Sequence, residues 1–397
     1  MISPTSALKS KNYLIYLVGA TISLHGLWIY RVALGWYSWE MTHSELWVGI
    51  IAATQFAPAV IFGPIFGVLA DRFDRRATSV LINSVSVFNM LVLGLLTSLG
   101  FMDIRVLMLL SLMQGILDGA HAPVRMSIVP NLVTREQLPN AIALTSISFN
   151  LSRVIGPAIA GLIIAVFGVA TAFTVNGVSY IGMVVAMCLI RLFPSGKNDE
   201  LRKHHWTELV DGASYCFTNP TLRGLLLVAA LSSVFGRGAL EMLPAFADQV
   251  YRGGPEALAI LTSAIGGGAI LVGLVMSRDS GWINNRTIRL GLTVSGLLVI
   301  LLGAIDNFAA VVVIVVGLGV TLSICGIGSQ ILIQIGIDDD FRGRVSSFWG
   351  MIAFGGTSLG SLLVGITAHF WGLQPAVIAA GALCALFSFP GLKRLSA

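Results

Sequence analysis

Hydrophobic residues occur along this chain in twelve long stretches that are separated by short polar turns. The stretches lie at about 13–38, 46–70, 77–99, 105–128, 139–166, 170–192, 221–247, 257–277, 288–305, 308–333, 345–369 and 373–391. A helix needs about 20 mostly apolar residues to cross a bilayer. The pattern therefore predicts an all-α membrane protein with twelve transmembrane helices.

Composition supports a membrane protein and argues against other classes. Hydrophobic residues make up 56% of the chain and charged residues 11%, whereas soluble domains carry about 25% charged residues. The first apolar stretch is too long for a signal peptide and lacks a small-residue cleavage site, so we expect it to remain as a span. The cysteines are far apart and form no metal-binding or disulfide pattern, so no metal or cofactor is predicted; they are Cys188, Cys216, Cys325 and Cys384.

The distribution of lysine and arginine predicts the orientation of the spans. If the N-terminus is cytoplasmic, 19 of the 24 basic residues fall on the inner side, and only Arg105 and Arg252 fall on the outer side. Cytoplasmic loops carry such an excess of positive charge. We therefore expect a bacterial-type inner membrane protein with both termini cytoplasmic. The net charge of +5 then reflects topology, and no nucleic-acid partner is predicted.

The polar segment 193–220 divides the chain into two predicted six-helix bundles, 1–192 and 221–397. We expect this segment to be a cytoplasmic linker; its His204 and His205 are a less favoured ligand site. Shifting the first half by 204 or 206 residues superimposes several positions on the second half, namely Gly156 on Gly360, Gly161 on Gly365 and Arg31 on Arg237. Such parallel repeats place a substrate pathway between the two halves, which suggests transport by alternating access.

The stretch GVLADRFDRR (67–76) resembles the cytoplasmic signature between helices two and three of the major facilitator superfamily. The matching residues are Gly67, Leu69, Asp71, Arg72, Arg75 and Arg76, whereas Asp74 stands where the family has glycine. The resemblance implies a cytoplasmic gate. We expect Asp71 to face the N-terminal end of span eleven, near Arg342 and Arg344, because a carboxylate is attracted to that end of a helix dipole.

A second stretch, NLSRVIGPAIAG (150–161), is similar to the span-five motif of exporters that exchange substrate for protons. Gly156, Pro157 and Gly161 match, and the surrounding sequence resembles the branch of enterobactin exporters and macrolide efflux pumps. This resemblance implies proton-coupled export. One feature departs from it: Ser111 stands where many drug exporters carry a proton-relay arginine upstream of a Gln-Gly pair.

Ionisable residues inside a membrane are costly and usually face a pathway or a partner. In span four, Asp118, His121 and Arg125 are spaced to share one helix face. They either line a cavity in which Asp118 titrates, or they lock helix packing while Arg125 reaches the inner surface. Arg153 in span five is either a structural residue or part of the pathway.

In span seven, Arg237 and Glu241 are spaced as an i, i+4 pair. In one interpretation, Arg237 and Arg31 of span one face each other across the pathway and favour anionic substrates such as catecholates or carboxylates, with Glu241 as a proton carrier. In the other, these residues form an outer gate or an ion-pair lock. Trp28, Gln55 and Gln330 are further candidate substrate contacts, although an aromatic residue in a span more often serves packing.

No enzyme motif is supported. GIGSQ (326–330) lacks the final glycine and the strand–turn–helix context of a nucleophile elbow. The sequence predicts a monomeric secondary transporter in a lipid bilayer that exports a small organic molecule, either a siderophore or an amphipathic drug. The resemblance to proton-coupled exporters implies that it exchanges this molecule for protons. The alternatives are an importer or uniporter of a small anionic metabolite and a non-transporting receptor or assembly protein.

Overall fold

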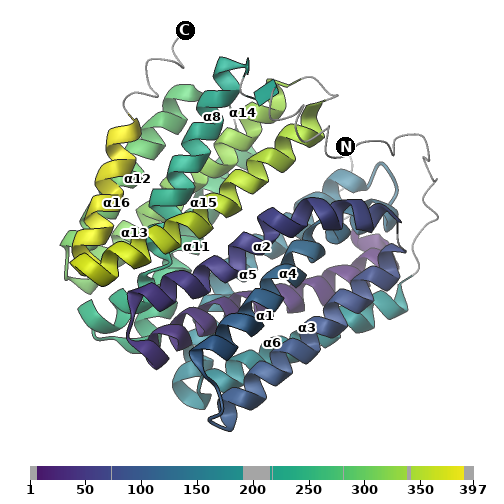
Figure 1. The fold of residues 1–397 in the computed structure, drawn as a ribbon. Coiled ribbons are helices and arrows are strands. Elements are labelled where there is room, and N and C mark those ends of the chain that lie inside the picture. The colour runs from purple at the N-terminus through teal and green to yellow at the C-terminus, as the bar shows by residue number, and fades with distance from the viewer. Residues whose placement is uncertain are drawn as a thin grey trace. The chain divides into compact units, whose positions relative to one another are not determined.

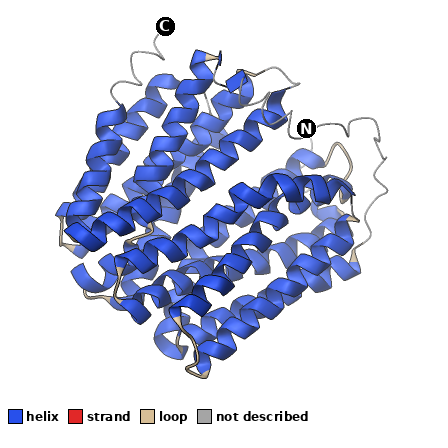
Figure 2. Ribbon diagram, viewed as in Figure 1, coloured by secondary structure: helices blue, strands red, loops and turns tan. Residues whose placement is uncertain are grey.

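The computed structural model describes residues 7–72, 74–190, 215–216, 218–279, 281–337 and 341–388. Every regular element in these ranges is a helix (Figure 2). Within them, eleven helices are long and apolar enough to cross a membrane, and α16 is a shorter apolar helix. The predicted all-α fold is confirmed, and twelve spans are compatible with these helices.

The first half of the chain supplies six long helices, labelled in Figure 1. After a 3-10 turn, η1 (Ala7–Lys9), they are α1 (Lys11–Thr42), α2 (Glu45–Arg72), α3 (Arg75–Ser98), α4 (Ile104–Ile128), α5 (Leu138–Phe167) and α6 (Val169–Leu189), with η2 (Val129–Asn131) after α4. Their positions agree with the first six predicted stretches. Pro123 and Pro157 lie inside α4 and α5 without ending either helix.

The second half is less regular than the sequence predicts. Its elements are α8 (Pro220–Leu231), η4 (Ser232–Arg237), α9 (Gly238–Leu240), α10 (Leu243–Ala245), η5 (Phe246–Val250), α11 (Gly254–Arg278), α12 (Asn285–Ala304), α13 (Phe308–Ser323), η6 (Ile324–Gly328), α14 (Ser329–Ile335), α15 (Arg342–Trp371) and α16 (Leu373–Ser388). Spans seven and ten, predicted as plain helices, contain the π-helical segments η4, η5 and η6. Such segments are rare and are frequent at functional sites.

Large apolar side chains are exposed along the long helices. On α5, Leu162, Val166 and Phe167 each expose more than 60% of their surface. A soluble protein would bury such a stripe, whereas the hydrocarbon core of a bilayer solvates it. The exposed side chains therefore fit a multi-pass membrane protein.

The chain groups into two compact units. Unit 1 comprises Met1–Tyr37 with Ile61–Leu201, and unit 2 comprises Ser38–Val60 with Arg202–Ala397. The end of α1 and the first half of α2 thus group with unit 2. The linker proposed at 193–220 lies largely outside the described residues, including His204 and His205. The domain boundaries drawn from the sequence stay a prediction.

Equivalent positions of the internal repeat make equivalent glycine contacts in the two units. In unit 1, a Cβ on Gly156 of α5 would lie 2.5 Å from the Cβ of Trp28 on α1. In unit 2, a Cβ on Gly360 of α15 would lie 2.0 Å from the carbonyl oxygen of Val234 in η4. The shift of 206 residues relates Trp28 to Val234, and the shift of 204 relates Gly156 to Gly360. Each repeat thus packs a span-five or span-eleven glycine against the same position of its partner helix.

The residue that departs from the family signature has a structural role. Asp74 is the N-cap of α3, and its side chain accepts a hydrogen bond from the backbone N–H of Ala77 at 2.7 Å. An N-cap carboxylate satisfies one of the orphan donors of the first turn. Aspartate therefore serves at this position as a helix start.

Replacing Asp74 tests this role. We expect Asp74→Ala to lower the free energy of unfolding by about 1 kcal/mol and Asp74→Gly by only a few tenths, because glycine is tolerated at N-caps. Thermal unfolding of the purified protein in detergent measures both. Equal losses for the two variants would contradict the capping role.

Candidate functional site

A buried polar network in unit 1 surrounds Asp118 of α4. The side-chain amide of Gln114 donates to Asp118 Oδ1 at 3.0 Å and to the Tyr180 hydroxyl of α6 at 3.1 Å. Tyr180 also hydrogen-bonds the carboxyl group of Asp118. Asn89 of α3 donates to Gln114 Oε1 at 3.3 Å. Three helices therefore hold one carboxyl group in place.

Two residues of α1 lie close enough to Asp118 to interact with it electrostatically. The guanidinium group of Arg31 acts on the Asp118 carboxyl group, and the carboxyl group acts on the hydroxyl of Tyr30. Gln114 and Tyr180 are buried, whereas Asp118 and Arg31 retain partial exposure. Asp118 thus carries a carboxyl group with fixed hydrogen-bond donors and a nearby cation.

A second group of residues in unit 1 combines aromatic rings with arginines. The guanidinium carbon of Arg31 lies 5.1 Å from the centre of the Trp28 ring, and that of Arg153 lies 5.8 Å from it. Phe149 meets Trp28 edge to face at 6.1 Å. The guanidinium carbon of Arg125 lies 5.8 Å from the centre of the Phe149 ring. We call these five residues, Trp28, Arg31, Arg125, Phe149 and Arg153, the arginine–aromatic cluster.

The two histidines of this region have separate surroundings. His121 lies close to the charge of Arg125. The sequence allowed Asp118 to pair with His121, but the contacts of Asp118 are with Gln114 and Tyr180. His25 of α1 contacts the Ser152 hydroxyl of α5 at 3.0 Å and the carbonyl oxygen of Thr21 at 2.8 Å. His25 therefore helps to hold α1 against α5.

The predicted pair in span seven lies in unit 2. Arg237 ends η4, Glu241 acts on it electrostatically, and Cys325 of η6 lies close to it. A Cβ on Gly326 would lie 2.8 Å from Arg237 Nη2, so this glycine makes room for the guanidinium group between two π-helical segments. Because Arg31 belongs to unit 1, the predicted facing of Arg31 and Arg237 stays a prediction.

The other candidate residues are placed as follows. Gln55 in α2 and Gln330 in α14 are half-buried residues of unit 2. The side chains of the predicted gate residues Gly67, Asp71, Arg72, Arg342 and Arg344 lie outside the described part of the chain. Arg75 and Arg76 are described, and Arg76 donates to the carbonyl oxygen of Cys188 at the end of α6 at 2.5 Å. The gate itself stays a prediction.

Unit 2 contains a polar contact that the sequence did not suggest. The indole N–H of Trp39, at the end of α1, donates to Asp248 Oδ2 in η5 at 3.0 Å. Gln249 donates to Glu45 Oε1 at 3.2 Å, and the Ser361 hydroxyl donates to the carbonyl oxygen of Gly49 at 3.2 Å. These bonds explain why residues 38–60 group with unit 2.

Breaking the Trp39–Asp248 bond should destabilise unit 2. Trp39 is 1% exposed, so Asp248→Ala leaves a buried N–H without its acceptor, at a cost of about 1–3 kcal/mol. Thermal unfolding of Asp248→Ala, Trp39→Phe and the double variant measures the coupling, and Glu256→Ala, at an exposed residue of α11, is the control. If the loss of stability in the double variant equals the sum of the losses in the two single variants, the prediction is contradicted.

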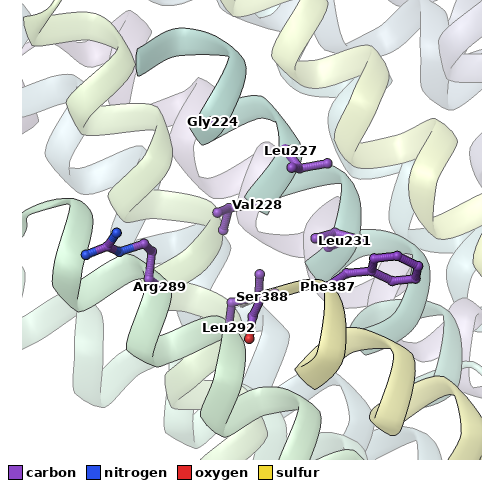
Figure 3. A pocket seen from close by; sticks show the side chains of 8 residues that line it. All are labelled: Gly224, Leu227, Val228, Leu231, Arg289, Leu292, Phe387 and Ser388. Carbon is purple, nitrogen blue, oxygen red and sulfur yellow. The ribbon is translucent and has the colours of Figure 1, made fainter. Parts of the chain in front are cut away.

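A small pocket also lies in unit 2, at α8, α12 and α16 (Figure 3). Its lining is mostly apolar, and Leu227 and Phe387 on its rim are 45% and 50% exposed. Arg289 and Ser388 are its polar side chains. A pocket with an exposed apolar rim on a membrane protein fits a lipid-facing gap better than a selective substrate site.

The sequence reasoning missed Tyr180 and Phe149 and treated Gln114 only as a family landmark. The i, i+4 spacing of Gln114 and Asp118 was a usable signal, because such residues are neighbours on a helix. No spacing rule points to Tyr180, which reaches Asp118 from another helix.

The helical fold, the exposed apolar surface and the internal repeat define a membrane transporter with two related halves. The family model of transmembrane secretion effectors, a group within the major facilitator superfamily, matches residues 2–393. The chain belongs to this family of transporters.

Curated relatives cover nearly the whole chain. The staphyloferrin A transporter of Staphylococcus aureus is 26% identical and covers 92% of this chain and 89% of its own length. The macrolide efflux protein A of Streptococcus pyogenes is 23% identical, with 94% and 93% covered. The enterobactin exporter EntS of Escherichia coli is 26% identical, with 87% and 82% covered. The resemblance to the efflux branch that the motifs indicated is thus confirmed.

A solved structure gives the same fold. A bacterial homolog of the human lysosomal transporter Spinster, in an inward-facing and unoccupied conformation, has a TM-score of 0.75 at 15% identity. The match covers 97% of this chain and 98% of that one. This likeness confirms the major facilitator fold.

Proposed function

We propose that this protein exports a small organic molecule across a bacterial-type inner membrane, with both termini cytoplasmic, in exchange for protons. Its substrate would be a siderophore or an amphipathic drug, carried by alternating access of the two halves. The names of two relatives, a macrolide efflux protein and an enterobactin exporter, support export. The excess of basic residues on one side of the spans supports the orientation.

The observation that carries proton exchange is the setting of Asp118. Asp118 lies well within α4, whereas Asp74 and Asp103, two other described carboxyl residues of unit 1, cap helix starts. Its partners come from α4 and α6, and Arg31 of α1 is close by. Ionisable groups inside membranes mark proton relays and substrate pathways. A carboxyl group that loses and regains a proton beside this cation would couple proton release to substrate binding.

Transport into everted membrane vesicles tests this function. The vesicle lumen corresponds to the cell exterior, so an acid lumen should drive an antiporter to accumulate substrate added outside. Two probes of opposite charge, 2,3-dihydroxybenzoate and ethidium, are each supplied at the outer face. We expect accumulation of at least one probe that depends on the pH gradient and collapses with a protonophore.

Two results would count against the proposal. Uptake that only equilibrates the probe across the membrane, and that the pH gradient does not change, would indicate a uniporter. Flux that runs only out of the vesicles with the proton gradient would indicate an importer. Vesicles that lack the protein supply the background.

A further inference from the structure

The arginine–aromatic cluster of unit 1 brings three positively charged side chains together. Its three guanidinium groups, from α1, α4 and α5, lie 5.1–5.8 Å from the Trp28 and Phe149 rings. The carboxyl group of Asp118 interacts with one of them, Arg31. Charge within a membrane span is costly, and residues that bear it usually serve a substrate or ion pathway.

The cluster also holds a hydrogen-bond donor without an acceptor. Trp28 Nε1 is buried, and no partner for it exists among the described residues. A buried indole N–H normally finds an acceptor. This donor lies on the ring that Arg31 and Arg153 flank, so an oxygen entering here would meet an N–H and two cations at once.

The second repeat shows that helix packing does not require Trp28, Phe149 or Arg153. By the same shifts, Val234 occupies the position of Trp28, Thr357 that of Arg153 and Ala353 that of Phe149. The close glycine contact is nevertheless kept, since Gly360 packs on Val234 as Gly156 packs on Trp28. Arg31 has a counterpart in Arg237, whereas Trp28, Phe149 and Arg153 add side chains that the second repeat does without.

Guanidinium geometry specifies the ligand. An arginine presents several N–H donors in one plane, which match a planar pair of oxygens in two parallel hydrogen bonds. A guanidinium stacked on a ring keeps that plane parallel to the ring. Carboxylates and catecholates both offer such an oxygen pair, whereas an organic cation would be repelled.

We propose that the arginine–aromatic cluster is a binding site for an organic anion that carries a planar pair of oxygens. The anion lies between Arg31 and Arg153 and accepts a hydrogen bond from Trp28 Nε1. This site rests on the proposed function in one respect, because its ligand is the exported molecule. Binding itself needs no proton gradient.

Equilibrium binding to the purified protein in lipid nanodiscs tests the site. Benzoate tests the carboxylate, catechol tests the vicinal oxygens, 2,3-dihydroxybenzoate combines both and ethidium is the cationic probe. We expect isothermal titration to detect an anionic probe, with binding weakened by salt, and no competition by ethidium. Whether benzoate or catechol competes with 2,3-dihydroxybenzoate identifies the oxygen pair that is recognised.

Charge-assisted hydrogen bonds set the size of the expected effects. Arg31→Gln and Arg153→Gln should each lower the affinity about ten- to a hundredfold. Arg31→Lys should lower the affinity less, because lysine keeps the positive charge and loses only the planar arrangement of N–H donors. Arg105→Gln removes an exposed arginine at the start of α4 and should leave binding unchanged. Elution profiles and thermal unfolding show which variants are folded.

The outcomes separate the site from the function. Ethidium binding that competes with the anions, or affinities that Arg31→Lys and both glutamine variants leave unchanged, would overturn the site while leaving export intact. Arginine-dependent anion binding without gradient-driven flux would uphold the site and overturn proton-coupled export. Binding that falls with Arg105→Gln as much as with Arg153→Gln would indicate surface attraction and would also overturn the site.

Discussion

Asp118→Asn should reduce proton-driven accumulation to the level of vesicles that lack the protein. Asparagine is nearly isosteric with aspartate and can still accept the hydrogen bond from the Gln114 amide, which spans 3.0 Å to Asp118 Oδ1. It cannot release or bind a proton in the transport cycle. The variant should therefore keep the fold and lose the coupling. Accumulation in everted vesicles with an acid lumen measures this effect.

Substrate exchange without a gradient distinguishes lost coupling from lost function. In vesicles preloaded with unlabelled probe, Asp118→Asn should still exchange labelled probe, because exchange needs no net proton movement. Asp103→Asn is the matched control in the same helix, since Asp103 caps α4 and asparagine caps equally well. Gradient-driven accumulation that survives Asp118→Asn would move the proton site elsewhere. Glu241 would then be tested by Glu241→Gln, alone and with Asp118→Asn.

The spans were predictable from sequence because their signal is strong and local. Runs such as 139–166 hold more than 20 mostly apolar residues, and a bilayer accepts such a run only as a helix. The structure places α5 at Leu138–Phe167, within a residue of the predicted ends. The glycines that related the two halves were equally informative, because Gly156 and Gly360 do make equivalent contacts.

The breaks in span seven were not predictable in the same way. A run of apolar residues does not distinguish an α-helix from a π-helix, so the stretch 221–247 predicts one continuous helix. The structure instead inserts η4 and η5 there. Gly236, Gly238 and Pro244 lower the cost of such a break, since glycine is permissive and proline lacks a donor. Where the backbone changes, however, depends on packing: Gly238 meets Gly360 of α15, where a Cβ would lie 2.5 Å from the carbonyl carbon.

The charged residues of the candidate site were predicted from the sequence, whereas the residues that contact them were not. An arginine or aspartate in an apolar span is conspicuous, so Arg31, Asp118 and Arg153 were found. Tyr180 and Phe149 are ordinary apolar-span residues until helix rotation is known. Their roles arise because α6 turns the Tyr180 hydroxyl towards Gln114 and α5 brings Phe149 to within 6.1 Å of Trp28. Contacts between helices carry no periodic signal in a single sequence.

Gly156→Ala should damage both stability and binding, because the span-five motif supports the arginine–aromatic cluster. The added Cβ would lie 2.5 Å from the Cβ of Trp28, so α1 and α5 must move apart. Overpacking of this kind costs about 1–3 kcal/mol. The same movement separates Trp28 from Arg153, which is now 5.8 Å from its ring. Anion affinity should therefore fall together with the unfolding temperature.

Gly182→Ala is the matched control in the same unit and should have the opposite effect on stability. A Cβ there would meet Ile22 at 3.6 Å, an ordinary contact, and alanine stabilises a helix by about 0.5–1 kcal/mol relative to glycine. Thermal unfolding and titration with 2,3-dihydroxybenzoate measure both variants. If Gly156→Ala lowers stability but leaves anion affinity unchanged, the motif serves packing alone. If both variants behave alike, the close approach of α5 to Trp28 is not what requires glycine at this position.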